Sequence, residues 1–157
     1  MRANEQAILV GAKTIINDNP QLNVRQVTGK SPHRFIVDPY CDIPESKVVF
    51  NDEQPTTVFV VKNHYKKMPS HVEIIEISSY KTSAIIREIY KKNMLSVFIE
   101  GGAYTINQFI QADLWDEAIV ITGNLSFKNG VLAPKLDLMP HDIQWLGNDQ
   151  FQYFKNS

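Results

Sequence analysis

The sequence has a single cysteine, Cys41, among 157 residues. One cysteine can form neither an intrachain disulfide nor a cysteine-based zinc site, and it suits a reducing compartment. The four histidines lack the spacing of metal ligands, so we expect no metal. His71 and Glu73 resemble the H-x-E of zinc deaminases, but no P-C-x-x-C follows them, which argues against that chemistry.

Long apolar runs and an excess of one charge are also missing. No stretch approaches the ~18 apolar residues that a membrane helix needs, and the first residues do not form a secretory signal. Sixteen Lys and Arg balance seventeen Asp and Glu, which argues against binding to duplex DNA. We therefore expect a cytoplasmic protein without membrane or nucleic-acid partners, folded as one domain over residues 1–157.

Short runs rich in Val and Ile recur along the chain and are typical of strands buried on both faces. Apolar residues at helical spacing separate several of them, near residues 12–17, 82–93 and 103–113. This alternation predicts an α/β layered sheet. The expected strands are residues 7–10, 35–37, 58–61, 74–77, 97–99 and 118–121.

Three local features complete the expected fold. Residues 143–146 and 151–154 flank the turn-forming Gly147-Asn148-Asp149, which predicts a terminal antiparallel hairpin. The proline-rich residues 39–57 predict a surface connection with one short strand near Val48. Thr82 or Ser83 is expected to cap the following helix.

The first candidate site follows the strand that ends at Gly11. Thr14 and Asp18 are four residues apart, so one helical turn places both on the same face, where they could hold ribose or amide groups. Arg25 lies beyond the turn and could clamp a phosphate. The alternative is that Asp18 forms a turn and Arg25 is a solvated surface residue.

The second candidate site is a strand that ends in Glu100 and is followed by Gly101 and Gly102 and then a helix. The glycines allow backbone N–H groups to face an anion at the helix N-terminus. The alternative is an ordinary strand–helix turn, because the G-x-G-x-x-G fingerprint is absent. Three further lysines could contact a phosphate or lie in a solvated loop: Lys62, Lys66 and Lys67.

Two signatures occur here in order. The first reads AILVGxxT…DxPxLxVR over residues 7–25 and is followed by RFIVD at 34–38; the second reads VFIEGG at 97–102 and continues as FIxAxLxDE at 109–117. Together they resemble the reductase domain of the bifunctional riboflavin-biosynthesis deaminase/reductase family. The resemblance covers most of the chain, from about Arg2 to Gly123.

The resemblance implies an α/β, dihydrofolate-reductase-like layered sheet with helices on both faces. Reductase domains of the family begin with a further strand carrying a D-G-K-type segment. We therefore expect this chain to be a fragment of a longer reductase domain, lacking that N-terminal strand and leaving an exposed sheet edge.

The implied activity is NADPH-dependent reduction of 5-amino-6-(5-phosphoribosylamino)uracil to the ribitylamino product by a homodimer. The implied NADPH contacts are Thr14, Asp18, Gly101, Gly102, Ala103, Tyr104 and Thr105. The implied substrate contacts are Arg2, Leu22, Arg25 and Glu100, and either Glu100 or a water is the proton donor.

Two alternatives remain open from the sequence. A dihydrofolate or pteridine-type reductase would share the same fold. A non-catalytic truncated remnant that only oligomerises or binds nucleotide would fit the missing N-terminal segment.

Overall fold

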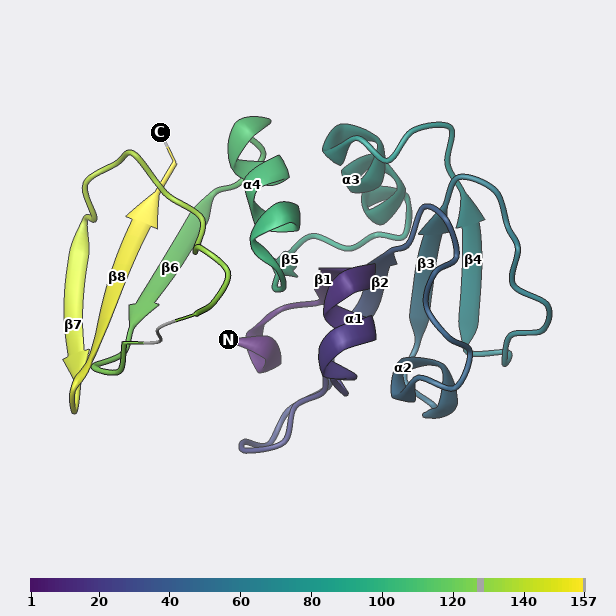
Figure 1. The fold of residues 1–157 in the computed structure, drawn as a ribbon, viewed down its shortest axis with the longest axis horizontal. Helices are drawn as coiled ribbons and strands as arrows, with labels where there is room; N and C mark the ends of the chain where they lie inside the picture. The colour runs from purple at the N-terminus through teal and green to yellow at the C-terminus, as the bar shows by residue number, and fades with distance from the viewer. Residues whose placement is uncertain (127–128, 157) are drawn as a thin grey trace.

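The computed structural model describes residues 1–126 and 129–156 (Figure 1). Its strands are β1 (Ala7–Gly11), β2 (His33–Val37), β3 (Thr56–Val60), β4 (Val72–Glu76), β5 (Val97–Ile99), β6 (Glu117–Thr122), β7 (Asp142–Leu146) and β8 (Asp149–Lys155). Its helices are η1 (Arg2–Asn4), a 3-10 helix, and α1 (Ala12–Asp18), α2 (Val48–Asn51), α3 (Thr82–Lys91) and α4 (Ala103–Gln111).

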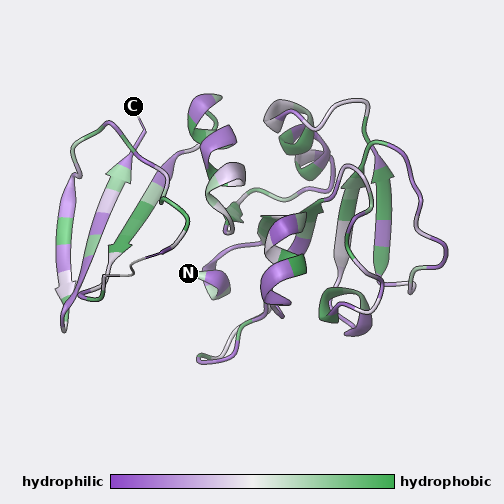
Figure 2. Ribbon diagram, viewed as in Figure 1, coloured by the Kyte–Doolittle hydropathy of each residue, from purple (hydrophilic) through white to green (hydrophobic). Residues whose placement is uncertain are grey.

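A parallel sheet in the order β4-β3-β2-β1-β5 forms the centre of the fold. Side chains alternate between the two faces of a strand, so Ile8 and Val10 pack with α1 and α2 while Ala7 and Leu9 pack with α3 and α4. Burial on both faces explains why β1, β2 and β3 are apolar with little alternation, as Figure 2 shows. The expected strands and the helices on both faces are confirmed.

The second sheet is antiparallel, in the order β6-β8-β7, and lies beyond α4 at one end of the molecule (Figure 1). The expected hairpin is confirmed: β7 and β8 pair from Leu146–Asp149 outward, and Gly147 adopts the left-handed φ of 62° that this tight turn requires. Within the described residues, β4 and β5 are the edge strands of the parallel sheet. The same part of the chain contains no helix long and apolar enough to cross a membrane.

Two local predictions were wrong. Val48 begins the short helix α2 rather than a strand, because a helical turn buries the consecutive residues Val49 and Phe50, whereas a strand would turn one of them away. The N-cap of α3 is Lys81, not Thr82 or Ser83. Thr82 is already helical and buried, and no side-chain hydrogen bond caps this helix.

Arg34 on β2 is a fully buried cation that fixes three chain segments. Its guanidinium forms an ion pair with Asp52, and its remaining N–H groups donate to the carbonyls of Gln21 (3.1 Å) and Gln54 (2.9 Å) and to Thr56 Oγ1 (2.9 Å). Every donor of the side chain therefore has an acceptor, which burial of a guanidinium demands. The bond to Gln21 anchors the loop that follows α1.

His33 lies at the amino end of β2, with Nε2 2.8 Å from Thr57 Oγ1. Thr57 donates to Glu73, which also pairs with Lys92. Burial, with the positive charges of Lys92 and Arg34, lowers the pKa of His33 from 6.5 to about 4 against the opposing effect of Glu73. The folded protein therefore holds His33 in its neutral form.

We expect the free energy of unfolding to decrease as the pH falls from 6.5 towards 4. In this pH window His33 is protonated in the unfolded chain but neutral in the folded protein. A falling pH therefore favours the unfolded state. Urea denaturation at several pH values should show a smaller decrease for His33→Gln, which keeps a donor for Thr57. The exposed control His64→Gln should retain the wild-type decrease; an unchanged slope in His33→Gln would contradict the assignment.

Candidate functional site

The pairing of β1 with β5 brings the two sequence signatures to one edge of the sheet. Leu9 is paired with Ile99, and the N–H of Glu100 donates to the Leu9 carbonyl at 3.0 Å. The strands are parallel, so both end on the same side, where β1 continues into α1 and β5 into α4 (Figure 1). Gly11 and Gly102 are the N-caps of these helices.

Thr14 of α1 contacts the turn before α4 directly. Its Oγ1 accepts a hydrogen bond from the N–H of Gly102 at 3.1 Å. A Cβ added to Gly101 would lie 3.1 Å from the same oxygen, and Gly101 has a φ of 146°, which side-chain-bearing residues rarely adopt. We call this junction of residues 11–14 with 101–105 the glycine corner.

Gly11 makes the matching contact from the other helix. A Cβ at this position would lie 2.6 Å from Thr105 Oγ1, so a larger residue would force the Thr105 side chain or α4 to shift. The free N–H groups of the first turn of α4 lie at this junction, beside Thr14. The arrangement therefore offers backbone donors and a hydroxyl to one anionic group.

Arg2 and Glu100 form a two-bond ion pair. Arg2 Nε donates to Glu100 Oε2 at 2.9 Å and Nη2 to Oε1 at 2.5 Å, while Nη1 donates to the Asn23 carbonyl at 3.2 Å. The hydrogen bonding of Arg2 to the Glu100 carboxylate raises the pKa of Arg2 more than burial lowers it. The carboxylate at the end of β5 thus holds Arg2 in place.

A cleft of about 340 Å³ begins at Arg2 and extends along the loop after α1. Arg25 is exposed and lines it with Arg2, so two guanidinium groups border the same space. Its lining residues are Met1, Arg2, Ala3, Asn23, Val24, Arg25, Gln26 and Val27. The cleft is connected to the glycine corner through the Arg2–Glu100 pair.

The other expected site residues are placed differently. Leu22 has its side chain in the core and a left-handed φ of 56°, so only its backbone is available to a ligand. Asp18 is exposed in the last turn of α1, one helical turn from Thr14. Ala103, Tyr104 and Thr105 form the first turn of α4.

Asn23 was missed by the sequence analysis. Its backbone carbonyl accepts from Arg2, and its Oδ1 is buried without a hydrogen-bond partner among the described residues. The sequence signal that could have identified Asn23 as a site residue is its position between Leu22 and Arg25 in the first signature.

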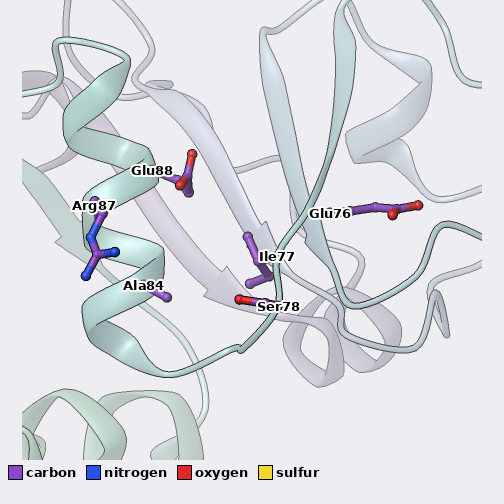
Figure 3. Close-up of a pocket in the computed structure, with 6 residues that line it drawn as sticks. All are labelled: Glu76, Ile77, Ser78, Ala84, Arg87 and Glu88. Carbon is purple, nitrogen blue, oxygen red and sulfur yellow. The ribbon is translucent and has the colours of Figure 1, made fainter.

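A second, smaller cavity of about 200 Å³ lies between the end of β4 and α3 (Figure 3). Figure 3 shows Arg87 and Glu88 on the helix and Ile77 and Ser78 on the segment that follows β4. It contains none of the expected site residues. Among residues 1–126 and 129–156, no group of three or more His, Cys, Asp or Glu could hold a metal.

Comparison with known proteins identifies the family. The model of the RibD C-terminal domain matches residues 1–125, which include both signatures and the whole glycine corner. The chain belongs to this family.

Curated relatives carry names from riboflavin biosynthesis. The riboflavin biosynthesis protein RibD of Aquifex aeolicus is 26% identical over 171 residues, covering 99% of this chain and 48% of that protein. A 2,5-diamino-6-ribosylamino-4(3H)-pyrimidinone 5′-phosphate reductase of Archaeoglobus fulgidus is 30% identical over 139 residues, covering 78% and 64%. The chain thus spans between about half and two thirds of the length of these relatives.

Solved structures of the family share the fold. The diaminohydroxyphosphoribosylaminopyrimidine deaminase/5-amino-6-(5-phosphoribosylamino)uracil reductase of Thermotoga maritima superposes with a TM-score of 0.87 at 26% identity, covering 100% of this chain and 47% of that chain. The riboflavin biosynthesis reductase Rib7 of Saccharomyces cerevisiae gives 0.70 at 26% identity, covering 98% and 76%. The expected dihydrofolate-reductase-like α/β fold is confirmed.

We expect Gly101→Ala to lower the free energy of unfolding by about 1–3 kcal/mol, because a Cβ is strained at a φ that is nearly restricted to glycine. The added methyl would also press against Thr14 Oγ1. Gly130→Ala is the matched control, since a Cβ there meets nothing within 4 Å. Urea denaturation of both variants measures the difference, and equal stability would show that the corner tolerates a side chain.

Proposed function

We propose that the chain is an NADPH-dependent reductase of a phosphoribosylaminopyrimidine in riboflavin biosynthesis, with 5-amino-6-(5-phosphoribosylamino)uracil as substrate. The observation that carries the proposal is the linked pair of subsites: the glycine corner, and a cleft bordered by Arg2 and Arg25. Glu100 is linked to both, because it directly follows β5 before the corner and binds Arg2. Family membership supports the same assignment.

The glycine corner fits a dinucleotide cofactor. A Cβ at Gly101 or Gly11 would occupy the space against Thr14 or Thr105, so the absence of side chains there keeps backbone N–H groups accessible. Thr14 and the first turn of α4 would hold the pyrophosphate, and Asp18 would accept from a hydroxyl or amide of the cofactor. When bound, NADPH supplies the hydride.

The arginine cleft fits the substrate's ribose phosphate. Arg25 is exposed and free to form two parallel hydrogen bonds to a phosphate, while Arg2 is held at the cleft by Glu100. Glu100 keeps lone pairs that can accept from pyrimidine N–H or amino groups. This division of roles would place the sugar between the two subsites.

The reaction needs a hydride at C1 of the ring-opened sugar and a proton on the attached nitrogen, converting the C=N bond to a C–N single bond. Both oxygens of Glu100 already accept N–H bonds from Arg2. Glu100 therefore acts as an orienting acceptor in our proposal, and a water delivers the proton. The residues contribute by aligning the partners and excluding other water.

Residues 1–157 would work as a single reductase-like domain. A homodimer is part of the proposal, since the second sheet presents exposed apolar side chains to solvent. These include Ile119, Ile121, Ile143, Trp145 and Leu146.

Steady-state turnover tests the function directly. The chain should oxidise NADPH in the presence of 5-amino-6-(5-phosphoribosylamino)uracil. The loss of NADPH absorbance measures the rate. The 2,5-diamino pyrimidinone phosphate named for the Archaeoglobus fulgidus relative and dihydrofolate serve as competing substrates. Turnover of dihydrofolate alone would contradict the assignment, and binding of NADPH without turnover of any of the three would favour a non-catalytic remnant.

We expect Arg25→Ala to raise the KM for the phosphoribosyl substrate by about 10- to 100-fold, as a lost charge-assisted hydrogen bond predicts. The Kd for NADPH should stay unchanged, because Arg25 does not lie at the glycine corner. Lys30→Ala removes a cation from the same loop outside the cleft lining and is the control. An equal effect of the two variants would point to general electrostatic attraction instead of a phosphate contact.

A further inference from the structure

The loop between α1 and β2 lines the arginine cleft, and its start is held by side chains from outside the loop. The loop covers residues 19–32 and projects from the sheet (Figure 1). Three consecutive main-chain carbonyls each accept one side-chain hydrogen bond: Gln21 from Arg34 Nη1 at 3.1 Å, Leu22 from Gln54 Nε2 at 3.4 Å, and Asn23 from Arg2 Nη1 at 3.2 Å. We call these three bonds the carbonyl cradle.

The backbone inside the cradle has a conformation that the local sequence disfavours. Leu22 has a left-handed φ of 56°, which costs free energy in a residue that carries a side chain. The buried Oδ1 of Asn23 has no hydrogen-bond partner among the described residues, which is a second cost. Strained positions of this kind persist only where the surrounding contacts determine them. The cradle therefore imposes the path that the chain takes from Leu22 to Arg25.

Gln54 binds the loop at both of its ends. Its Nε2 donates to the Leu22 carbonyl near the start of the loop and to the carbonyl of Pro32, the last loop residue, at 3.4 and 2.7 Å. The other two cradle bonds hold the start of the loop. Because one amide group fixes both ends, the part of the chain between them has fewer conformations available.

The backbone of Gln54 is itself fixed by the core. Its N–H donates to Asp52 Oδ1 at 3.2 Å, and its carbonyl accepts from Arg34 Nη2 and from the Thr56 hydroxyl, each at 2.9 Å. Asp52 is the ion-pair partner of the buried Arg34. The Gln54 amide is therefore pre-organised by the same network that anchors the start of β2 and β3.

The position of Arg25 depends on the base of the loop. The N–H of Val24 donates to Ser31 Oγ at 3.1 Å, which joins the two sides of the loop, and the residues between them, 25–30, are exposed. Arg25 directly follows this bond and lines the cleft. Two parallel hydrogen bonds to a phosphate require accurate placement of a guanidinium group. A change of the backbone at Leu22 would therefore move Arg25 away from that geometry.

We propose that Gln54 is a positioning residue for the substrate: by binding both ends of the loop it places Arg25 at the cleft and so sets the affinity for a sugar phosphate. The inference rests on the proposed function, which assigns the ribose phosphate to this cleft. Gln54 lies outside both sequence signatures and does not line the cleft. Substrate affinity thus depends on a side chain that the substrate does not touch.

Isothermal titration calorimetry with ribose 5-phosphate and with NADPH tests the role of Gln54. Gln54→Leu removes both donated bonds at similar side-chain size, and should weaken ribose 5-phosphate by roughly 5- to 30-fold, the range for lost hydrogen bonds. The Kd for NADPH should not change. In the turnover assay the KM for the pyrimidine should rise by a similar factor while kcat is retained, because the hydride-transfer geometry does not involve Gln54.

A double variant shows whether Gln54 acts through Arg25. Adding Gln54→Leu to Arg25→Ala should cause little further loss of ribose 5-phosphate affinity, because the group that Gln54 positions is already gone. Ile89→Ala is the control for lowered stability. Ile89 is buried in α3 and belongs to the core cluster on the opposite face of the sheet from Leu22. This control should unfold at lower urea concentration but bind ribose 5-phosphate like the wild type.

Three results would overturn the positioning role. They are wild-type affinity for ribose 5-phosphate in Gln54→Leu, fully additive losses in the double variant, and equal weakening of NADPH and ribose 5-phosphate. The last pattern indicates a general structural defect. Wild-type protein that binds no ribose 5-phosphate would overturn the phosphate role of the cleft and the role of Gln54 with it.

The outcomes also separate this inference from the proposed reductase activity. Turnover by the wild type with an unchanged KM in Gln54→Leu would overturn the positioning role and leave the activity standing. Weakened ribose 5-phosphate binding in Gln54→Leu, together with no turnover of any pyrimidine by the wild type, would support the positioning role and overturn the activity.

Discussion

The close approach of α4 to the end of β1 is the constraint on which the site depends. It requires β1 and β5 to be parallel neighbours, so that their following helices start at the same edge. It also requires glycine where a Cβ would meet Thr14 or Thr105. Residues 11–14 and 101–105 are far apart in the sequence. They share one surface because the strands are parallel neighbours and because glycine leaves room for the contact. The geometry of the glycine corner follows from the packing of the core strands.

The ion pair between Arg2 and Glu100 joins that corner to the arginine cleft. Glu100 is positioned by its backbone bond to Leu9 and uses both side-chain oxygens to hold Arg2. Arg2 also bonds to the Asn23 carbonyl, which ties the loop after α1 to the same assembly. In the proposed function, these three segments define the space between cofactor and substrate. In the proposed function their joint task is alignment, which suits a reaction whose reducing equivalent comes from the cofactor.

The sequence was sufficient for the strands and for the two signatures, because buried parallel strands leave continuous Val- and Ile-rich runs and the glycine turn is local. It was insufficient where distant residues decide the structure. The helix at Val48 forms because Val49 and Phe50 both reach the core, which periodicity over four residues does not reveal. The Arg2–Glu100 bond joins residues 98 positions apart, and each residue alone was compatible with a separate role.

The buried polar groups at the amino ends of the strands have a consequence for how this domain can diverge. His33, Arg34 and Thr57 lie near the start of β2 and β3, whereas the exposed Tyr40 and Tyr80 follow the opposite ends of β2 and β4. Substitutions in the loops carrying Tyr40 or Tyr80 leave the hydrogen bonds of Arg34 and His33 intact. Single replacements of exposed loop residues at this rim of the sheet therefore leave the hydrogen-bond network at the other rim in place and need no compensating changes there.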